Sequence, residues 1–113
     1  MIRILVPTKM AAIAATFAFA SGAMVALAAE RTISQKGRAF SETEVTLNKD
    51  ETILFVNDDD VTHNVISTSA GNEFNLGAQA PGVSTPVTFK TAGEVKVRCA
   101  IHPRMQLIVK VKD

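Results

Sequence analysis

The residues best suited to chemistry lie near the C-terminus, where Cys99, His102 and Met105 follow one another at intervals of three residues. They are the single cysteine, one of the two histidines and the only methionine beyond residue 24. A thiolate, an imidazole and a thioether are ligands for a soft transition metal, and for copper above all. An electron-transfer copper site needs two histidines, one cysteine and a distant axial methionine. The second histidine must then be His63, the only other one in the sequence.

Other interpretations of these residues explain less of the pattern. Taken one at a time, an inward cysteine is usually a small core residue, and a methionine usually fills a gap in the core. Structural zinc takes four ligands from cysteine and histidine, and a thioether is a poor substitute. The sequence has no C-x-x-C-H motif for haem attachment. A cysteine–histidine nucleophile is available in principle. Because no third orienting group can be identified, we do not expect an enzyme.

The first 29 residues have the pattern of a helical secretory signal peptide. Arg3 and Lys9 precede an uncharged, alanine-rich run over residues 10–29, which closes with an Ala-Leu-Ala triplet. A basic start, an apolar middle and an A-x-A site are typical of a signal peptide, so we expect cleavage near Ala28 or Ala29.

An uncleaved membrane anchor is the alternative, because the apolar run is about long enough to span a bilayer. Its high alanine content and the cleavage site favour removal. The sequence therefore predicts a signal peptide over residues 1–29 and, over residues 30–113, a domain that is periplasmic or otherwise exported. After cleavage we expect no stable insertion in the membrane.

The charge and cysteine content of the predicted domain exclude some partners. Without Arg3 and Lys9 the domain carries 10 basic and 11 acidic residues, a net charge of −1. Binding of nucleic acid needs a basic excess, so we expect none. A lone cysteine in an exported chain cannot form an internal disulfide, and it indicates intermolecular pairing, a reactive thiol or a metal.

Short runs of β-forming residues, separated by turn residues, fill the predicted domain, and no stretch has a helical period. The expected strands cover residues 32–40 with a break at Gly37, then 44–47, 52–56, 62–67, 86–90, 94–98 and 105–112, with a short apolar island at 74–76. Strands at this spacing favour a β-sandwich or barrel. The sequence therefore predicts one all-β domain of seven to eight strands.

Strand alternation predicts where the two sulfur atoms point. Val95, Val97 and Cys99 alternate with charged residues and share one face of a strand, and Met105 shares a face with Leu107. Only five residues separate Cys99 from Met105, so the two strands are expected to be antiparallel neighbours. Both sulfurs then point into the core at the same end of the domain.

The two ligand motifs resemble those of the cupredoxins, the blue copper family that includes plastocyanin, pseudoazurin and amicyanin. His63 and Asn64 match the strand-borne histidine followed by asparagine in that family, and the segment 99–105 matches the ligand loop between the last two strands. The spacing C-x2-H-x2-M, with Pro103 after the histidine, is most similar to the short loop of amicyanin. The resemblance covers residues 32–112 and implies a Greek-key β-sandwich. Arg98 is a departure, because plastocyanins carry tyrosine there.

The resemblance implies a type 1 blue copper protein that binds one copper ion per chain through His63, Cys99, His102 and axial Met105. Such a protein would be a monomer that carries single electrons between redox partners, such as a cytochrome, a dehydrogenase or an oxidase. Asn64 would tie the His63 strand to the cysteine loop and donate a hydrogen bond to the Cys99 sulfur. A copper chaperone or buffer is the alternative. Such a protein would favour Cu(I) through several methionines, whereas the predicted domain has one.

Two loops receive further predictions. Ile101 and Pro103 flank His102 and predict a small apolar patch where electrons enter and leave, with Arg104 as a rim charge that suits an acidic partner. In the alternative, Ile101 and Pro103 only cover the copper and Arg104 only aids solubility.

The acidic run 58–60 is interpreted as a solvated turn, because a calcium loop needs more oxygen ligands at fixed spacing.

Overall fold

The computed structural model describes residues 30–113, so the predicted signal peptide over residues 1–29 lies outside the described residues. The described chain consists of strands and connecting loops, and within it no helix could span a membrane. Its elements are β1 (Glu30–Lys36), β2 (Ala39–Phe40), β3 (Glu44–Asn48), β4 (Thr52–Asn57), β5 (Val65–Ser67), β6 (Phe74–Asn75), β7 (Ser84–Thr88), β8 (Gly93–Cys99) and β9 (Gln106–Lys112).

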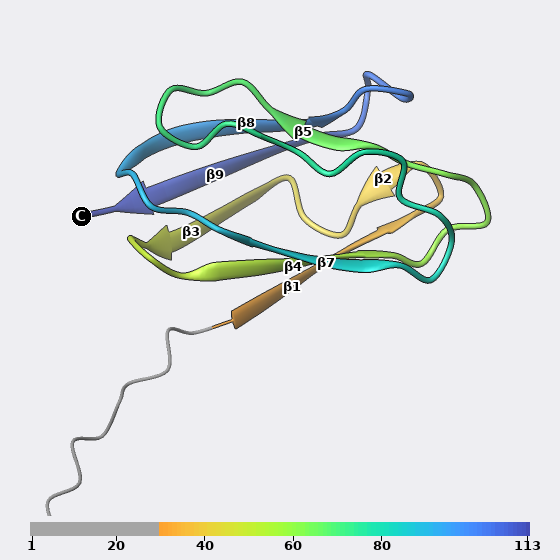
Figure 1. Ribbon diagram of the computed structural model, residues 1–113, viewed down its shortest axis with the longest axis horizontal. Coiled ribbons are helices and arrows are strands. Elements are labelled where there is room, and N and C mark those ends of the chain that lie inside the picture. The colour runs from red at the N-terminus through yellow and green to blue at the C-terminus, as the bar shows by residue number, and fades with distance from the viewer. Residues whose placement is uncertain (1–29) are drawn as a thin grey trace, which may run out of the picture.

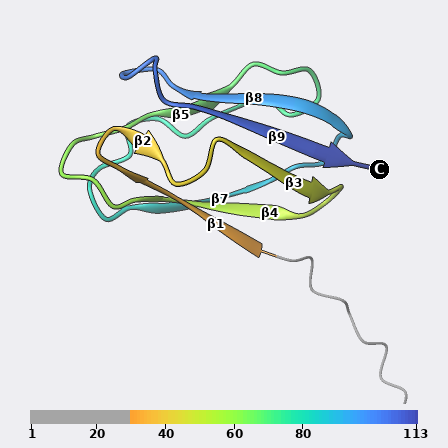
Figure 2. The same cartoon turned by 180° about the vertical axis from the view of Figure 1, so that it is seen from behind.

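The strands form two sheets that pack face to face (Figure 1 and, from behind, Figure 2). One sheet has the order β2-β1-β4-β7 and the other the order β3-β9-β8-β5-β6. The pairs β1/β4 and β3/β9 are parallel, and the other neighbours are antiparallel. Because strands adjacent in space are often distant in sequence, long connections cross from sheet to sheet. The predicted all-β sandwich is confirmed.

The strands differ from the prediction in several places, and β7, for example, begins and ends two residues before the strand predicted over residues 86–90. The first predicted strand is a hairpin of β1 and β2, because Gly37 and Arg38 have φ angles of 60° and 56°, the left-handed values of a two-residue hairpin turn. The apolar island contributes the two-residue β6, so the described chain has nine strands. The strand expected over residues 62–67 is shorter, because only Val65–Ser67 pairs with β8, and His63 forms an isolated bridge.

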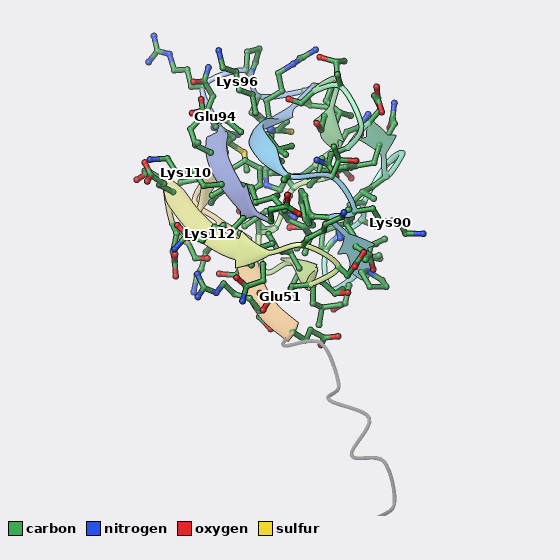
Figure 3. The ribbon with its side chains drawn as sticks, turned by 90° about the vertical axis from the view of Figure 1, so that its left-hand side faces the viewer. Glu51, Lys90, Glu94, Lys96, Lys110 and Lys112 are labelled. Atoms are coloured by element: carbon green, nitrogen blue, oxygen red, sulfur yellow. The ribbon has the colours of Figure 1, made fainter. Side chains whose placement is uncertain are left out.

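Alternation along the strands separates the core from the charged surface. In β8 the buried residues are Val95, Val97 and Cys99, as the parity argument predicts. The charged side chains between them point outward, and Figure 3 shows Glu94 and Lys96 directed away from the sheets. This figure looks at the end of the sandwich that holds the C-terminus.

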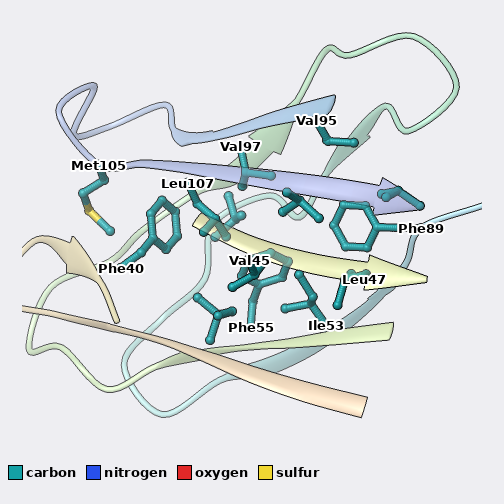
Figure 4. Close-up of a cluster of buried hydrophobic side chains, with 14 of the residues drawn as sticks. Phe40, Val45, Leu47, Ile53, Phe55, Phe89, Val95, Val97, Met105 and Leu107 are labelled. Carbon is teal, nitrogen blue, oxygen red and sulfur yellow. The ribbon is translucent and has the colours of Figure 1, made fainter. Parts of the chain in front are cut away.

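The core between the sheets is one cluster of buried side chains that includes both predicted sulfur ligands. Figure 4 shows Met105 and Phe40 at one end of this cluster and Phe89 at the other. Strands β8 and β9 are antiparallel neighbours, and their last pair is Arg98 with Gln106. Cys99 and Met105 therefore lie next to each other at the end of the hairpin, as predicted.

Candidate metal centre

Three connections meet at the end of the sandwich opposite the C-terminus (Figure 1). They are the β1–β2 turn, the β4–β5 loop with His63, and the β8–β9 loop with His102. Val65 pairs with Cys99 in the ladder between β5 and β8, so His63, two residues earlier, is next to the end of β8. The pairing of β5 with β8 thus brings together His63 and Cys99, which are 36 positions apart in the sequence.

The structure places His63, Cys99 and His102 around one point. The Nδ1 atoms of the two histidines are 3.1 Å apart. The Cys99 Sγ atom is 3.7 Å from Nδ1 of His63 and 3.9 Å from Nδ1 of His102. Among residues 30–113, these three residues form a group whose side chains could hold a metal ion together.

The size of this triangle fits a metal ion. A point about 2.1 Å from each of the three atoms lies within it, and metal bonds to imidazole nitrogen and thiolate sulfur measure about 2.0–2.3 Å in zinc proteins. A thiolate with two imidazoles in one plane is the donor set of electron-transfer copper sites, where methionine is a weak axial ligand. The residues present therefore fit copper.

The three donors differ in their access to solvent. His63 and Cys99 are completely buried, and Cys99 is a free thiol. His102 is half-buried, and its neighbours Ile101, Pro103 and Arg104 are exposed. The ring of His102 is therefore the part of the cluster that reaches the surface.

Backbone hydrogen bonds hold the loop that carries Cys99, His102 and Met105. The N–H of Met105 donates to the carbonyl of His102 at 2.9 Å, and the N–H of Cys99 donates to the carbonyl of Met105 at 3.2 Å. The Met105 side chain is 2% exposed and points into the space between the sheets (Figure 4). Met105 is thus buried beside the cluster, at the same end of the core.

Asn64 connects the two ligand-bearing segments through its backbone. Its N–H donates to Sγ of Cys99 at 3.4 Å, and its carbonyl accepts from the N–H of Ala100 at 2.9 Å. Its side-chain oxygen is buried without a hydrogen-bond partner among the described residues. The bond to sulfur that the resemblance implies is therefore made by the main chain.

The interpretation of residues 58–60 as a solvated turn is wrong for Asp59. Asp58 and Asp60 are exposed, but the side chain of Asp59 is only 8% exposed. Its Oδ2 atom lies 2.9 Å from Nε2 of His63 and accepts the N–H of Arg38 at 2.8 Å. These two hydrogen bonds, led by the one from Arg38, hold the pKa of the Asp59 carboxyl well below its usual range. The sequence signal that could have indicated this contact is the carboxylate of Asp59 four residues before the candidate ligand His63.

A buried polar network behind His63 was not predicted at all. His63 and Gln79 exchange both backbone hydrogen bonds, at 3.0 and 2.7 Å. The Gln79 side chain is 1% exposed, accepts from Gln35 at 2.7 Å and donates to the carbonyl of Phe55 at 2.9 Å. Asn57, also buried, donates to the carbonyl of Gln79 at 2.8 Å. Within this network only the side-chain oxygen of Gln35 is buried without a hydrogen-bond partner. Buried polar groups that are hydrogen-bonded are rigid, so the bonds of Gln79 and Asn57 fix the backbone that carries His63.

The sequence matches a known family over nearly all of the described residues. The model of the copper binding proteins of the plastocyanin/azurin family matches residues 27–112. The chain therefore belongs to this family, whose members bind one copper ion. The resemblance of the chain to cupredoxins is confirmed, and copper is the metal that the cluster fits.

Individual proteins in the comparisons support this assignment. Methylamine utilization protein MauL of Methylorubrum extorquens is 33% identical over 99 residues, which cover 85% of this chain and 87% of that protein. A variant of amicyanin in its reduced Cu(I) form at pH 4 superposes with a TM-score of 0.66 at 20% identity, over 76% of this chain and 85% of that one. The Cu-containing nitrite reductase NirK from Thermus scotoductus SA-01 has a TM-score of 0.69 at 24% identity.

The match to the nitrite reductase is partial. It covers 75% of this chain but only 23% of the reductase, so the likeness is confined to one part of that enzyme. At identities below 25% the two structural matches show the shared fold, and they assign no activity to this chain.

Proposed function

We propose that this chain is an exported type 1 copper protein that carries single electrons between redox partners. Copper would be held by His63, Cys99 and His102, with Met105 as the axial ligand. The observation that carries the proposal is the triangle of one sulfur and two nitrogen atoms with sides of 3.1, 3.7 and 3.9 Å. When bound there, copper supplies a one-electron couple whose potential the thiolate and the axial ligand tune.

The residues around the cluster support fast electron transfer. His63 is fixed by its backbone bonds to Gln79, and Cys99 is the last residue of β8. Ligands held on rigid elements move little when the metal changes its oxidation state, which lowers the cost of each transfer. Four protein donors would leave no free position for a substrate, and for this reason we propose a carrier and not an enzyme.

We propose that electrons pass through the exposed edge of His102. A shallow pocket beside it is lined by His102, Ile101, Pro103, Arg104 and Arg38. Ile101 is 52% exposed, which is high for a large apolar side chain, and the two arginines flank it. An apolar centre with a positive rim suits a transient encounter with an acidic redox protein. Arg38 joins the sequence-based patch because the β1–β2 turn lies at this end of the fold.

The patch around His102 indicates the chemistry of the partner, which is a redox protein with an acidic surface. A cytochrome, a dehydrogenase and an oxidase are each compatible with a small apolar patch that has a positive rim. We further propose that the protein works in the periplasm, on the basis of the signal-peptide pattern in residues 1–29. By resemblance to the small blue copper proteins, we propose that it is a monomer.

A copper chaperone or buffer is the second candidate function. It would take up and release Cu(I) through an accessible site. Against it, His63 and Cys99 are 0% exposed and only one methionine is present beyond residue 24. An ion held in this cluster could leave only past His102. The burial of the ligands therefore favours a carrier.

Electron self-exchange should separate the two functions. In a mixture of the Cu(I) and Cu(II) forms, we expect proton NMR signals near His102 to broaden through electron exchange between molecules. The same mixture should keep its copper when a strong chelator of Cu(I) is added, over the time of the NMR experiment. Rapid loss of copper to the chelator, with no exchange broadening, would favour the chaperone.

A further inference from the structure

Both oxygen atoms of the Asp59 carboxylate form hydrogen bonds with neighbouring groups. Its Oδ2 atom contacts Nε2 of His63 at 2.9 Å and the N–H of Arg38 at 2.8 Å, and its Oδ1 atom accepts the N–H of Asp60 at 2.9 Å. The N–H of Asp59 donates to the side-chain oxygen of Asn57 at 3.0 Å. Asn57 is itself buried in the network with Gln79. The position of this carboxylate is therefore determined by the fold.

The bond to Asp59 determines which nitrogen of His63 carries the proton. An ionised carboxylate can only accept hydrogen bonds, so Nε2 must be the protonated nitrogen. In the neutral ring the lone pair is then on Nδ1, the atom that faces Cys99 and His102 at 3.7 and 3.1 Å. Of the two neutral tautomers of His63, the carboxylate thus selects the one that can bind a metal at this point.

The same bond changes the strength of His63 as a ligand. A carboxylate that accepts the second N–H of a ligand histidine fixes the orientation of the ring and raises its basicity. The negative charge also stabilises a doubly charged ion more than a singly charged one. Both effects favour Cu(II) over Cu(I).

We propose that Asp59 is a positioning residue that sets the tautomer of His63 and lowers the reduction potential of the bound copper. This inference rests on the proposed copper site. It gives a role to the turn between β1 and β2, because Arg38 has the left-handed φ of 56° and directs its N–H at Asp59. The β1–β2 turn of the four-stranded sheet thus fixes Asp59, and Asp59 in turn fixes His63, which lies next to the five-stranded sheet.

Two substitutions separate the charge of Asp59 from its hydrogen bond. Asp59→Asn removes the charge but keeps an oxygen that accepts the N–H of His63, whereas Asp59→Ala removes both. Loss of such a partner lowers metal affinity about 10–100-fold. We expect the Cu(II) affinity to fall about tenfold in Asp59→Asn and by up to about 100-fold in Asp59→Ala. With the Cu(I) affinity unchanged, the potential rises by about 59 mV for each tenfold loss.

The matched control is Asp58→Asn. It removes the same charge from the preceding residue, whose side chain is exposed. It should shift the potential far less than Asp59→Asn, because a solvent-exposed charge is screened. Equal shifts in the two variants, or an unchanged potential in both Asp59 variants, would overturn the proposal.

A second measurement needs no copper. Nitrogen-15 NMR of the metal-free protein reports which nitrogen of His63 is protonated. We expect Nε2–H alone in the parent protein and in Asp59→Asn, and a mixture of the two tautomers in Asp59→Ala. A parent protein with the proton on Nδ1 would overturn the role of Asp59. Because this result is independent of metal binding, failure of the inference and failure of the copper function are distinguishable.

Discussion

Replacing Cys99 with alanine is expected to abolish the blue colour of the copper-loaded protein completely. The colour of such sites comes from charge transfer between the cysteine sulfur and Cu(II), and Cys99 is the only cysteine in the sequence. Any Cu(II) that still binds to His63 and His102 would have nitrogen and oxygen ligands and a pale spectrum. Absorption of visible light by the purified variant with one equivalent of Cu(II) measures this effect.

Met105→Leu is the companion to this substitution. Leucine has about the volume of methionine, so the buried end of the core should keep its packing at a cost below about 1.5 kcal/mol. The colour should remain, because the thiolate is still present. The potential should rise, because the proposed axial ligand is a weak donor that stabilises Cu(II). A colourless Met105→Leu protein, or a blue Cys99→Ala protein, would contradict the assignment of these two ligands.

The second large effect is expected at the surface around His102. Ile101→Glu places a charge at the centre of the apolar patch, on a side chain that is 52% exposed. The few dominant residues near the centre of an interface contribute about 2 kcal/mol or more to binding, about 30-fold in an equilibrium constant, and Ile101 has the position of such a residue. We expect the second-order rate of electron transfer to an acidic soluble c-type cytochrome to fall by about that factor. The spectrum and the potential should remain nearly unchanged.

Conservative and distant variants test this interpretation. Ile101→Leu should react at the parent rate, because it keeps the patch apolar. Arg104→Glu should lower the association rate and weaken its dependence on ionic strength, because rim charges act mainly on encounter. Lys90→Glu makes the same change of charge at the other end of the sandwich (Figure 3) and should have little effect. If Ile101→Glu and Arg104→Glu both react at the parent rate, electrons do not pass through His102.

Strand parity made the sulfur-bearing part of the site predictable. Residues alternate strictly in β8 and β9, so the inward direction of Cys99 and Met105 could be read from their apolar neighbours Val97 and Leu107. The antiparallel pairing followed from the short loop between the strands. These local rules depend on nothing beyond the hairpin itself.

The surroundings of His63 were not predictable in the same way. Asp59 is in a loop, where no periodic pattern indicates the direction of a side chain, and its burial depends on the N–H of Arg38 from a distant turn. Gln79 lies in a stretch rich in turn residues between β6 and β7, and its burial depends on Gln35 and Phe55 from the four-stranded sheet. Contacts of this kind exist only after the two sheets pack together.

The most direct test of the copper site is the reaction of the purified protein with one equivalent of Cu(II). A site made of His63, Cys99, His102 and Met105 should give an intense blue absorption band. Its EPR spectrum should show the narrow copper hyperfine splitting of a thiolate-bound ion. Cys99 should then resist alkylation, because its sulfur is bound to the metal. A colourless protein in which Cys99 is still freely alkylated would contradict the copper site.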